Sequence, residues 1–278
     1  MKKTYLSKGT TEQLARSIRE HCLRMVHRAR SSHIGSSLSI VDIVAVLFGA
    51  IMNLKPLEPK WMNRDRFILS KGHACSAIYA VLAELGFFKK TELLNFGADH
   101  SIFMTHISHK VPGVEFSTGS LGHGMPFGLG KALAAKKTGQ SWKTYVVIGD
   151  GELAEGSNWE AALFAAHHKL DNFIVIIDCN NLQSLTTVEK TLNIEPLAEK
   201  FLAFGWAVEE VDGHNHLQLT RALSTAPWRP GKPSLLIART IKGKGVSFME
   251  NSVEWHYRSP NDQQLNQALL ELERDTHA

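Results

Sequence analysis

The sequence lacks the features typical of exported, membrane-spanning, disulfide-rich or zinc-binding proteins. Its three cysteines, Cys22, Cys75 and Cys179, are far apart and form no C-x-x-C pair, so neither a disulfide framework nor a zinc site is predicted. No stretch approaches the roughly 18 apolar residues of a membrane span. The start, MKKTYLSKGTTEQ, has three lysines but no apolar signal segment. These absences predict a protein of the reducing cytoplasm, with no membrane association.

Nucleic-acid binding and repeat architectures find equally little support. The net charge is +4, yet the basic residues are scattered rather than gathered with aromatic residues into a stripe. The chain has no internal repeat, low-complexity segment or Pro/Gly/Ser-rich linker that would divide it. Its 278 residues, 44% of them apolar, suffice for a substantial core. We therefore predict a single domain over residues 1–278.

The stretch from residue 144 to 183 has the pattern of a β-α-β unit. Residues 144–148 and 173–178 are apolar, β-branched runs typical of buried parallel strands. Apolar side chains recur between them at helical spacing: Leu153, Trp159, Ala162, Leu163, Ala166 and Leu170. A right-handed crossover places the carboxyl ends of both strands at one sheet edge, where ligands bind in open α/β folds. The predicted fold class is α/β, with a mostly parallel central sheet flanked by helices.

Oxygen-bearing side chains follow both of these strands. Asp150 lies between two glycines after the first, and Asn180 follows the second, with 28 residues between Gly151 and Asn180. A carboxylate, an amide oxygen and the carbonyls after Asn180 suit Mg²⁺ or Ca²⁺ and leave positions for phosphate oxygens. The glycines permit close backbone approach, and a helix starting after them would offer N–H groups to an anion. Either motif alone is also typical of a tight turn or a strand cap.

The amino-terminal part is predicted to be helical. Thr10 begins an amphipathic helix as part of a possible capping box, and this helix ends in a small polar loop over residues 28–37 that contains His33. Ser39 or Asp42 is expected to start a second, strongly apolar helix. A histidine in such a loop is often only a polar contact.

A second strand-glycine-helix pattern lies upstream of the β-α-β unit. Residues 63–70 lead into a short strand, which ends in Lys71-Gly72-His73 at the start of a helix. The helix N–H groups and the imidazole of His73 could both face a phosphate there. A histidine that merely caps the helix would give the same pattern.

Residues 98–124 form a long irregular segment with His106 and His109. Loops of this length are uncommon unless they are functional. A Gly- and Ala-rich helix is predicted to follow at about residues 125–137, and a last helix at about residues 260–274.

These motifs resemble, in order and rough spacing, those of transketolases. The blocks that carry the resemblance are SSH at residue 33, RFILSKGH at 73, TH at 106 with GVEFSTGSLGHG, GDGELAEGSNWEA, CNNLQ, PLAEKFLAFGW and TIKGKGVSFMENSVEWH. They span about residues 10–260, which is similar to the amino-terminal half of a transketolase. The second domain, which binds the cofactor's aminopyrimidine, and the third are missing from this chain. The resemblance therefore implies a stand-alone amino-terminal subunit of a split transketolase, assembled with a separate carboxy-terminal subunit, two copies of each.

The resemblance also implies how thiamine diphosphate would be held. The side chains of Asp150 and Asn180 and the carbonyl of Leu182 would bind Mg²⁺ or Ca²⁺. The residues that would surround the diphosphate are Gly151, His73, Lys242 and His256. Gly119 and Leu121 would hold the aminopyrimidine from this side.

Four histidines would line the substrate cleft and move protons on the substrate's hydroxyls: His33, His73, His106 and His256. Glu155 would lie near the cofactor at a subunit interface, although Glu155 and Glu160 are equally typical of ordinary charges on a helix face. The implied reaction is transfer of a two-carbon ketol unit from a ketose, as a sugar phosphate, to an aldose, as in pentose phosphate metabolism.

Two departures from the family pattern keep alternatives open. Ile107-Ser108-His109 stands where a proline usually follows His106, and Ser184-Leu185-Thr186-Thr187 stands where an Asp-Gly turn is usual after Gln183. Both flank the predicted substrate entrance. An acyloin-forming, transketolase-like enzyme of specialised metabolism and a non-catalytic subunit that retains the fold remain alternatives. The α subunit of a 2-oxo-acid dehydrogenase is disfavoured, because its pattern lacks the four histidines.

Overall fold

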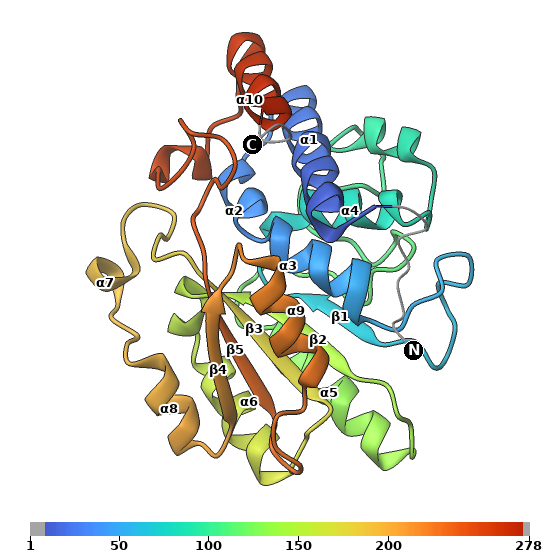
Figure 1. Cartoon of the computed structure of the whole chain (residues 1–278), viewed down its shortest axis with the longest axis vertical. Helices are drawn as coiled ribbons and strands as arrows, with labels where there is room; N and C mark the ends of the chain where they lie inside the picture. The colour runs from blue at the N-terminus through green and yellow to red at the C-terminus, as the bar shows by residue number, and fades with distance from the viewer. Residues whose placement is uncertain (1–8, 275–278) are drawn as a thin grey trace.

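A computed structural model describes residues 9–274, which form a parallel β-sheet covered by helices on both faces (Figure 1). The strands are β1 (Arg66–Leu69), β2 (Thr144–Gly149), β3 (Phe173–Cys179), β4 (Ala207–Asp212) and β5 (Ser234–Arg239). Their order in the sheet is β1-β2-β3-β5-β4, and every neighbouring pair is parallel. The predicted α/β class is confirmed. The two ends of the predicted domain, residues 1–8 and 275–278, lie outside the described residues.

Ten α-helical segments lie within the described residues: α1 (Thr11–Ala29), α2 (Ile34–Ser39), α3 (Val41–Val46), α4 (Cys75–Glu84), α5 (Gly124–Lys137), α6 (Gly156–His167), α7 (Val188–Thr191), α8 (Leu197–Ala203), α9 (His216–Thr225) and α10 (Asp262–Arg274). Short 3₁₀ or π turns connect them: η1 (Leu47–Ile51), η2 (Gly72–Ala74), η3 (Lys90–Asn95), η4 (Gly151–Ala154) and η5 (Val253–His256). The predicted β-α-β unit is β2-α6-β3, and the capping box at Thr10 is present. None of these helices combines the length and apolarity needed to cross a bilayer.

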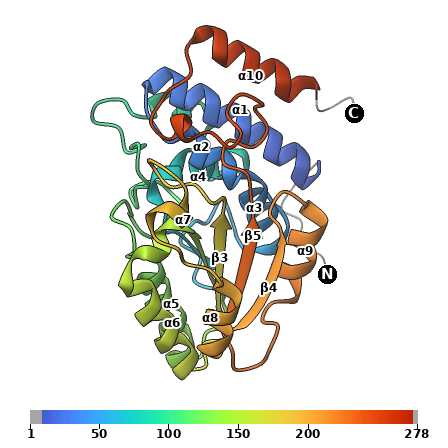
Figure 2. The same cartoon turned by 90° about the vertical axis from the view of Figure 1, so that its left-hand side faces the viewer.

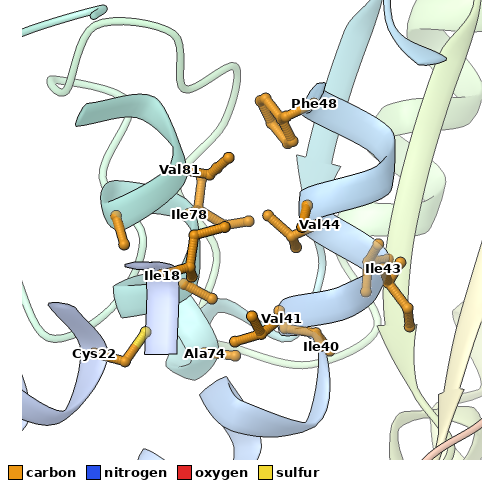
Figure 3. Packing of buried hydrophobic residues seen from close by; sticks show 14 of the residues in the cluster. Ile18, Cys22, Ile40, Val41, Ile43, Val44, Phe48, Ala74, Ile78 and Val81 are labelled. Atoms are coloured by element: carbon orange, nitrogen blue, oxygen red, sulfur yellow. The ribbon is translucent and has the colours of Figure 1, made fainter. Parts of the chain in front are cut away.

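The sheet is buried on both faces, which explains the unbroken apolar runs of its central strands. Successive side chains of a strand point to opposite faces. Tyr145 and Val147 of β2 join the core formed with α1, α3, α4 and α9, whereas Val146 and Ile148 join the core formed with α5, α6 and α8. Figure 2 shows α3 and α9 on one side of the sheet and α5 and α6 on the other. Figure 3 shows the first core, where residues of α1, α3 and α4 interdigitate.

The predicted loop over residues 28–37 is wrong in its second half. Residues Ile34–Ser39 form the buried helix α2, which begins directly after His33, and His33 has a positive φ of 75°. The serines mislead because serine usually favours turns. Here their hydroxyls have buried partners: Ser37 accepts a hydrogen bond from Ser76 (2.8 Å), and Ser39 donates to Asp178 (2.6 Å). The apolar helix predicted next begins at Val41 and ends in a π-helical turn.

A second difference concerns the turn after β2. The regular helix expected to start directly after Gly151 starts at Gly156, and one 3₁₀ turn, η4, precedes it. The side chain of Asp150 accepts a hydrogen bond from the backbone N–H of Gly151 (2.7 Å) and so caps this short turn. That N–H is therefore already paired within the chain.

Candidate active site

A cleft of about 240 Å³ lies at the carboxyl edge of the sheet. The turns after β1, β2, β3 and β5 supply its floor, and the segments at the starts of α2 and α5 and in η5 supply its walls. Its lining includes eleven of the twelve predicted site residues: His33, His73, His106, Gly119, Leu121, Asp150, Gly151, Asn180, Leu182, Lys242 and His256. Parallel strands bring their carboxyl ends together, so this convergence follows from the topology.

Asp150 and Asn180 end neighbouring strands and are almost entirely buried. Burial raises the pKa of Asp150 to about 6, and the nearby Asp178 carboxylate adds to the rise. Desolvation destabilises the ionised form of a buried carboxyl group, and a bound cation would stabilise that form. The amide nitrogen of Asn180 donates hydrogen bonds to Asp178 and Ser39. Its amide oxygen therefore points away from these two residues and accepts a hydrogen bond from the backbone N–H of Leu182 (3.1 Å).

The donor set fits a hard divalent cation. It comprises a carboxylate, an amide oxygen and the Leu182 carbonyl, which are the oxygen ligands that Mg²⁺ and Ca²⁺ prefer. Within residues 9–274 no group of three or more His, Cys, Asp or Glu side chains is arranged to hold a metal by itself. Three protein oxygens leave the coordination shell incomplete, so a ligand bearing phosphate oxygens would have to complete it.

Beneath these residues lies a buried ion pair between Lys71 and Asp178. Burial alone would raise the pKa of Asp178, but the Lys71 ammonium and the hydroxyls of Ser39 and Thr240 hold it below its usual range. The pair joins the ends of β1 and β3. Because Asp178 also accepts from Asn180 (3.0 Å), the ion pair fixes the orientation of a predicted metal ligand.

The four predicted histidines form one cluster with His33 at its centre. The ring centroid of His33 lies 5.1 Å from that of His73, 5.5 Å from His106 and 5.0 Å from His256. Burial lowers the pKa of His33 to about 4 and that of His256 to about 3, with neighbouring charged groups adding to both shifts. Burial also lowers the pKa of His73 and His106. The rings are therefore neutral at pH 7, each with one N–H donor and one acceptor nitrogen.

Lys242 provides a cationic side chain at one wall of the cleft. Its ammonium donates to Nδ1 of His256 (2.9 Å) and to the carbonyl of Gln183 (3.0 Å). Burial lowers its pKa to about 8, and the nearby Lys71 contributes to the shift. An incoming anion would stabilise the ammonium form.

Comparisons with known proteins identify the family to which this chain belongs. Residues 10–275 match the family model described as "Transketolase, thiamine diphosphate binding domain". The chain belongs to the transketolase family. It is 40% identical to a protein of Phocaeicola vulgatus that is named as one of the subunits of apulose-4-phosphate transketolase, over 95% of this chain and 94% of that one. It is 37% identical to a 6-deoxy-6-sulfo-D-fructose transketolase subunit of a Clostridium species, over 94% and 95% of the two chains.

A solved structure shares the fold. The transketolase of Campylobacter jejuni superimposes on 95% of this chain with a TM-score of 0.89 and 34% sequence identity. The match covers 42% of that longer chain, so this chain spans about two fifths of the length of the solved transketolase.

Of the predicted site residues of this transketolase-family chain, Glu155 lies away from the cleft. Glu155 is exposed at the start of α6, in contact with the loop at Gly122, and it is absent from the cleft lining. Its role toward the cofactor stays a prediction. His109, which is part of one departure from the family pattern, bonds to the hydroxyl of Ser117 (2.8 Å) and does not line the cleft either.

Sequence reasoning missed Glu152 and Gln183, both of which line the cleft. The buried Glu152 carboxylate accepts hydrogen bonds from the hydroxyl of Ser70 and from the N–H groups of Gly122 (2.9 Å) and Gly149 (3.3 Å). It therefore holds together three segments of the cleft that are distant in sequence. The position of Glu152 directly after the Gly-Asp-Gly turn was a usable signal. Gln183 had a weaker one, its place three residues after Asn180.

Proposed function

We propose that this chain is the diphosphate-binding subunit of a thiamine-diphosphate-dependent transketolase, which transfers a two-carbon ketol unit from a ketose to an aldose. The observation that carries the proposal is the meeting, in one cleft, of an oxygen ligand set, a buried lysine and four neutral histidines. The proposal includes Mg²⁺, with Ca²⁺ as a substitute, and a cytoplasmic location.

Each part of the cleft has a task in this proposal. Asp150, Asn180 and the Leu182 carbonyl hold the cation, and Lys242 and His73 meet the diphosphate. When bound, the thiazolium of the cofactor supplies the carbanion stabilisation that no side chain can supply. Gly119 and Leu121 contact the aminopyrimidine, and the missing side chain of Gly119 leaves room beside His106, whose ring carbon would lie 3.3 Å from a Cβ there.

The histidines act on the substrate's oxygens. A neutral imidazole can donate a hydrogen bond to a carbonyl or hydroxyl and accept a proton at its other nitrogen. His33 is fixed by its backbone, whose N–H donates to the carbonyl of His256 (2.8 Å). His256 is fixed as an acceptor at Nδ1 by Lys242, which leaves Nε2–H as its donor. These constraints orient two rings of the cluster before a substrate arrives.

The proposed partner is a separate carboxy-terminal transketolase subunit, in an assembly of two copies of each. Support comes from relatives of matching length that are named transketolase subunits. We propose a sugar phosphate as donor. The names of those relatives contain different sugars, so we leave the donor sugar open.

Ketol transfer in a reconstituted complex tests the function. The chain is mixed with the product of a neighbouring reading frame that resembles the other two transketolase domains, and transfer from a series of ketose phosphates to an aldose phosphate is followed. Transfer should require both thiamine diphosphate and Mg²⁺ and should disappear with Asp150→Ala. Cofactor binding without transfer to any acceptor would favour a non-catalytic subunit, and acyloin formation from a non-sugar donor would favour the specialised enzyme.

A further inference from the structure

A buried carboxylate outside the cleft lies at the centre of a polar network. Asp42 is the only charged residue of the apolar helix α3. Its oxygens lie 2.5 Å from Arg19, 2.7 Å from Nδ1 of His214 and 3.0 Å from Nε2 of His216. Helices α3 and α9 pack side by side, which brings Asp42 to the two histidines at the start of α9 (Figures 1 and 2). The four residues line a cavity of their own and are absent from the cleft lining.

The hydrogen bonds of His214 fix its tautomer. The backbone N–H of Ile241 donates to Nε2 of His214 (2.8 Å). A backbone amide nitrogen can only donate, so Nε2 carries the lone pair and the ring proton lies on Nδ1, which faces Asp42. The carboxylate thus sets the tautomer, and this tautomer makes the ring an acceptor for the segment after β5.

The same carboxylate holds this segment, residues 240–244, at a second point. Arg19 donates to Asp42 through Nη2 and to the carbonyl of Lys244 through Nε (3.1 Å). Lys242 therefore lies between two backbone groups, the N–H of Ile241 and the carbonyl of Lys244, that are both held by partners of Asp42. From this backbone the side chain of Lys242 reaches the wall of the cleft.

His216 shares the carboxylate but has a different second partner. Its Nε2 lies at the other oxygen of Asp42, and its Nδ1 lies 2.9 Å from the hydroxyl of Thr11, the first residue of α1. Among residues 9–274 it makes no hydrogen bond to the segment after β5. Of the two histidines on Asp42, His214 is thus the one that is linked to the backbone next to Lys242.

We propose that His214 is a positioning residue for Lys242: with its tautomer set by Asp42, it holds the backbone of Ile241 and so keeps the Lys242 ammonium in place for an anion. This inference rests on the proposed function, which assigns Lys242 to the diphosphate. His214 touches no ligand in this account and acts only through the backbone. A cation that is already in place costs less to order when the anion binds, so affinity should depend on His214.

The test measures binding by titration calorimetry in Mg²⁺. His214→Phe keeps a ring at this position but removes the acceptor for Ile241. The Kd for thiamine diphosphate should rise about tenfold, the lower end of the range for residues that orient the ligands of a metal site. Inorganic diphosphate serves as a second probe and should show a similar rise. His214→Asn is a second variant, which keeps a donor near the position of Nδ1 but is too short to accept from Ile241, and it should show the same rise.

His216→Phe is the matched control. Like His214→Phe, it removes one donor from Asp42, so both variants should lower the melting temperature of the ligand-free chain. Only His214→Phe also breaks the link to Ile241. His216→Phe should therefore bind both probes as the wild type does.

A double-mutant cycle with Lys242→Met tests whether His214 acts through Lys242. Lys242→Met should weaken binding of both probes because it removes the ammonium. Adding His214→Phe to Lys242→Met should change the Kd little further, since the group that His214 positions is then missing.

Three outcomes overturn the inference while leaving the proposed function standing. They are an unchanged Kd in the folded His214 variants, an equal rise of the Kd with His216→Phe, and an effect of His214→Phe that is as large in the Lys242→Met background as in the wild type. A wild type that binds neither probe contradicts the proposed function itself, and the inference with it.

Discussion

The side-chain amide of Asn180 donates to Asp178 at 3.0 Å, and Asp178 is in turn paired with Lys71 in the interior. This relationship decides which face of the Asn180 amide is available. Because the amide nitrogen of Asn180 donates to Asp178 in the interior, only the amide oxygen is available to a cation in the cleft.

Asp178→Asn should therefore impair cation-dependent cofactor binding, although it leaves the predicted metal ligand Asn180 itself unchanged. The new amide can donate where a carboxylate accepted, and it leaves Lys71 as an uncompensated buried charge. We expect the Kd for thiamine diphosphate with Mg²⁺ to rise at least tenfold, in line with other residues that orient metal ligands. We also expect a loss of about 3–5 kcal/mol in the free energy of unfolding.

Calorimetry and urea denaturation check the two effects of Asp178→Asn. A suitable control is Asp171→Asn, which breaks the more exposed pair with Lys136. It should change stability by about 1 kcal/mol or less and leave binding unaffected. Normal binding by Asp178→Asn would show that the orientation of Asn180 does not depend on Asp178.

Alanine substitutions of the cleft histidines should have two different effects, one on turnover and one on cofactor binding. His106→Ala should leave thiamine diphosphate binding nearly intact and lower kcat about a hundredfold or more, the usual scale for losing a positioned proton-transfer group. His73→Ala should instead weaken cofactor binding, because His73 follows β1 beside Lys71 at the floor of the cleft. His109→Ala should retain activity, because His109 bonds to Ser117 outside the cleft lining. Kinetics at saturating cofactor distinguish these cases, and full activity of His106→Ala would exclude that ring from catalysis.

The buried Asp42 should give the chain an acid-sensitive contribution to stability. Burial would raise its pKa, but Arg19, His214 and His216 surround the carboxylate and lower the pKa far below its ordinary value of 3.8. A carboxyl group with a depressed folded pKa stabilises the fold above its unfolded pKa, and this contribution is lost as the pH falls. At pH 7, Asp42→Asn should lower the free energy of unfolding by about 3–5 kcal/mol.

The pH dependence provides the check on Asp42. The difference in unfolding free energy between wild type and Asp42→Asn should shrink progressively as the pH falls below about 4, by no more than roughly 1.4 kcal/mol per pH unit for one proton. Urea denaturation at a series of pH values measures this difference. A difference that grows in acid would have the wrong sign for this account.

The isolated chain should be inactive in ketol transfer and gain activity only when a companion subunit is added. The reason is that no second unit able to bind the aminopyrimidine from the other side is found among residues 9–274, which form one sheet with its helices. Activity should titrate to a plateau at equal amounts of the two chains, with native mass spectrometry giving two copies of each. Ketol transfer by the purified single chain would refute the prediction.

The sequence predicted β2, β3 and the site between them because both signals are local. Asp150 and Asn180 each follow an apolar strand directly, and the parallel arrangement of the strands places both residues at the same edge of the sheet.

The sequence pattern did not predict β4, because Glu209 and Glu210 interrupt its apolar run. β4 is an edge strand and is only partly buried. Edge strands tolerate polar residues because one side faces solvent.

The serines of α2 and the amide of Gln183 were missed for a different reason. Ser37 and Ser39 become compatible with a buried helix only through partners distant in sequence, Ser76 and Asp178. Likewise, Gln183 acquires its position from the absent side chain of Gly151. Such relationships between distant segments leave no periodicity in the sequence.

The most direct measurement for the central claim is a calorimetric titration of thiamine diphosphate into the chain, with and without Mg²⁺, for the wild type, Asp150→Ala and Asn180→Ala. The account predicts cation-dependent binding to the wild type and loss of the binding signal in both variants, while circular dichroism shows an intact fold. Equal affinity in all three proteins, or wild-type binding that is indifferent to Mg²⁺, would contradict the assignment of this cleft as a metal-diphosphate site.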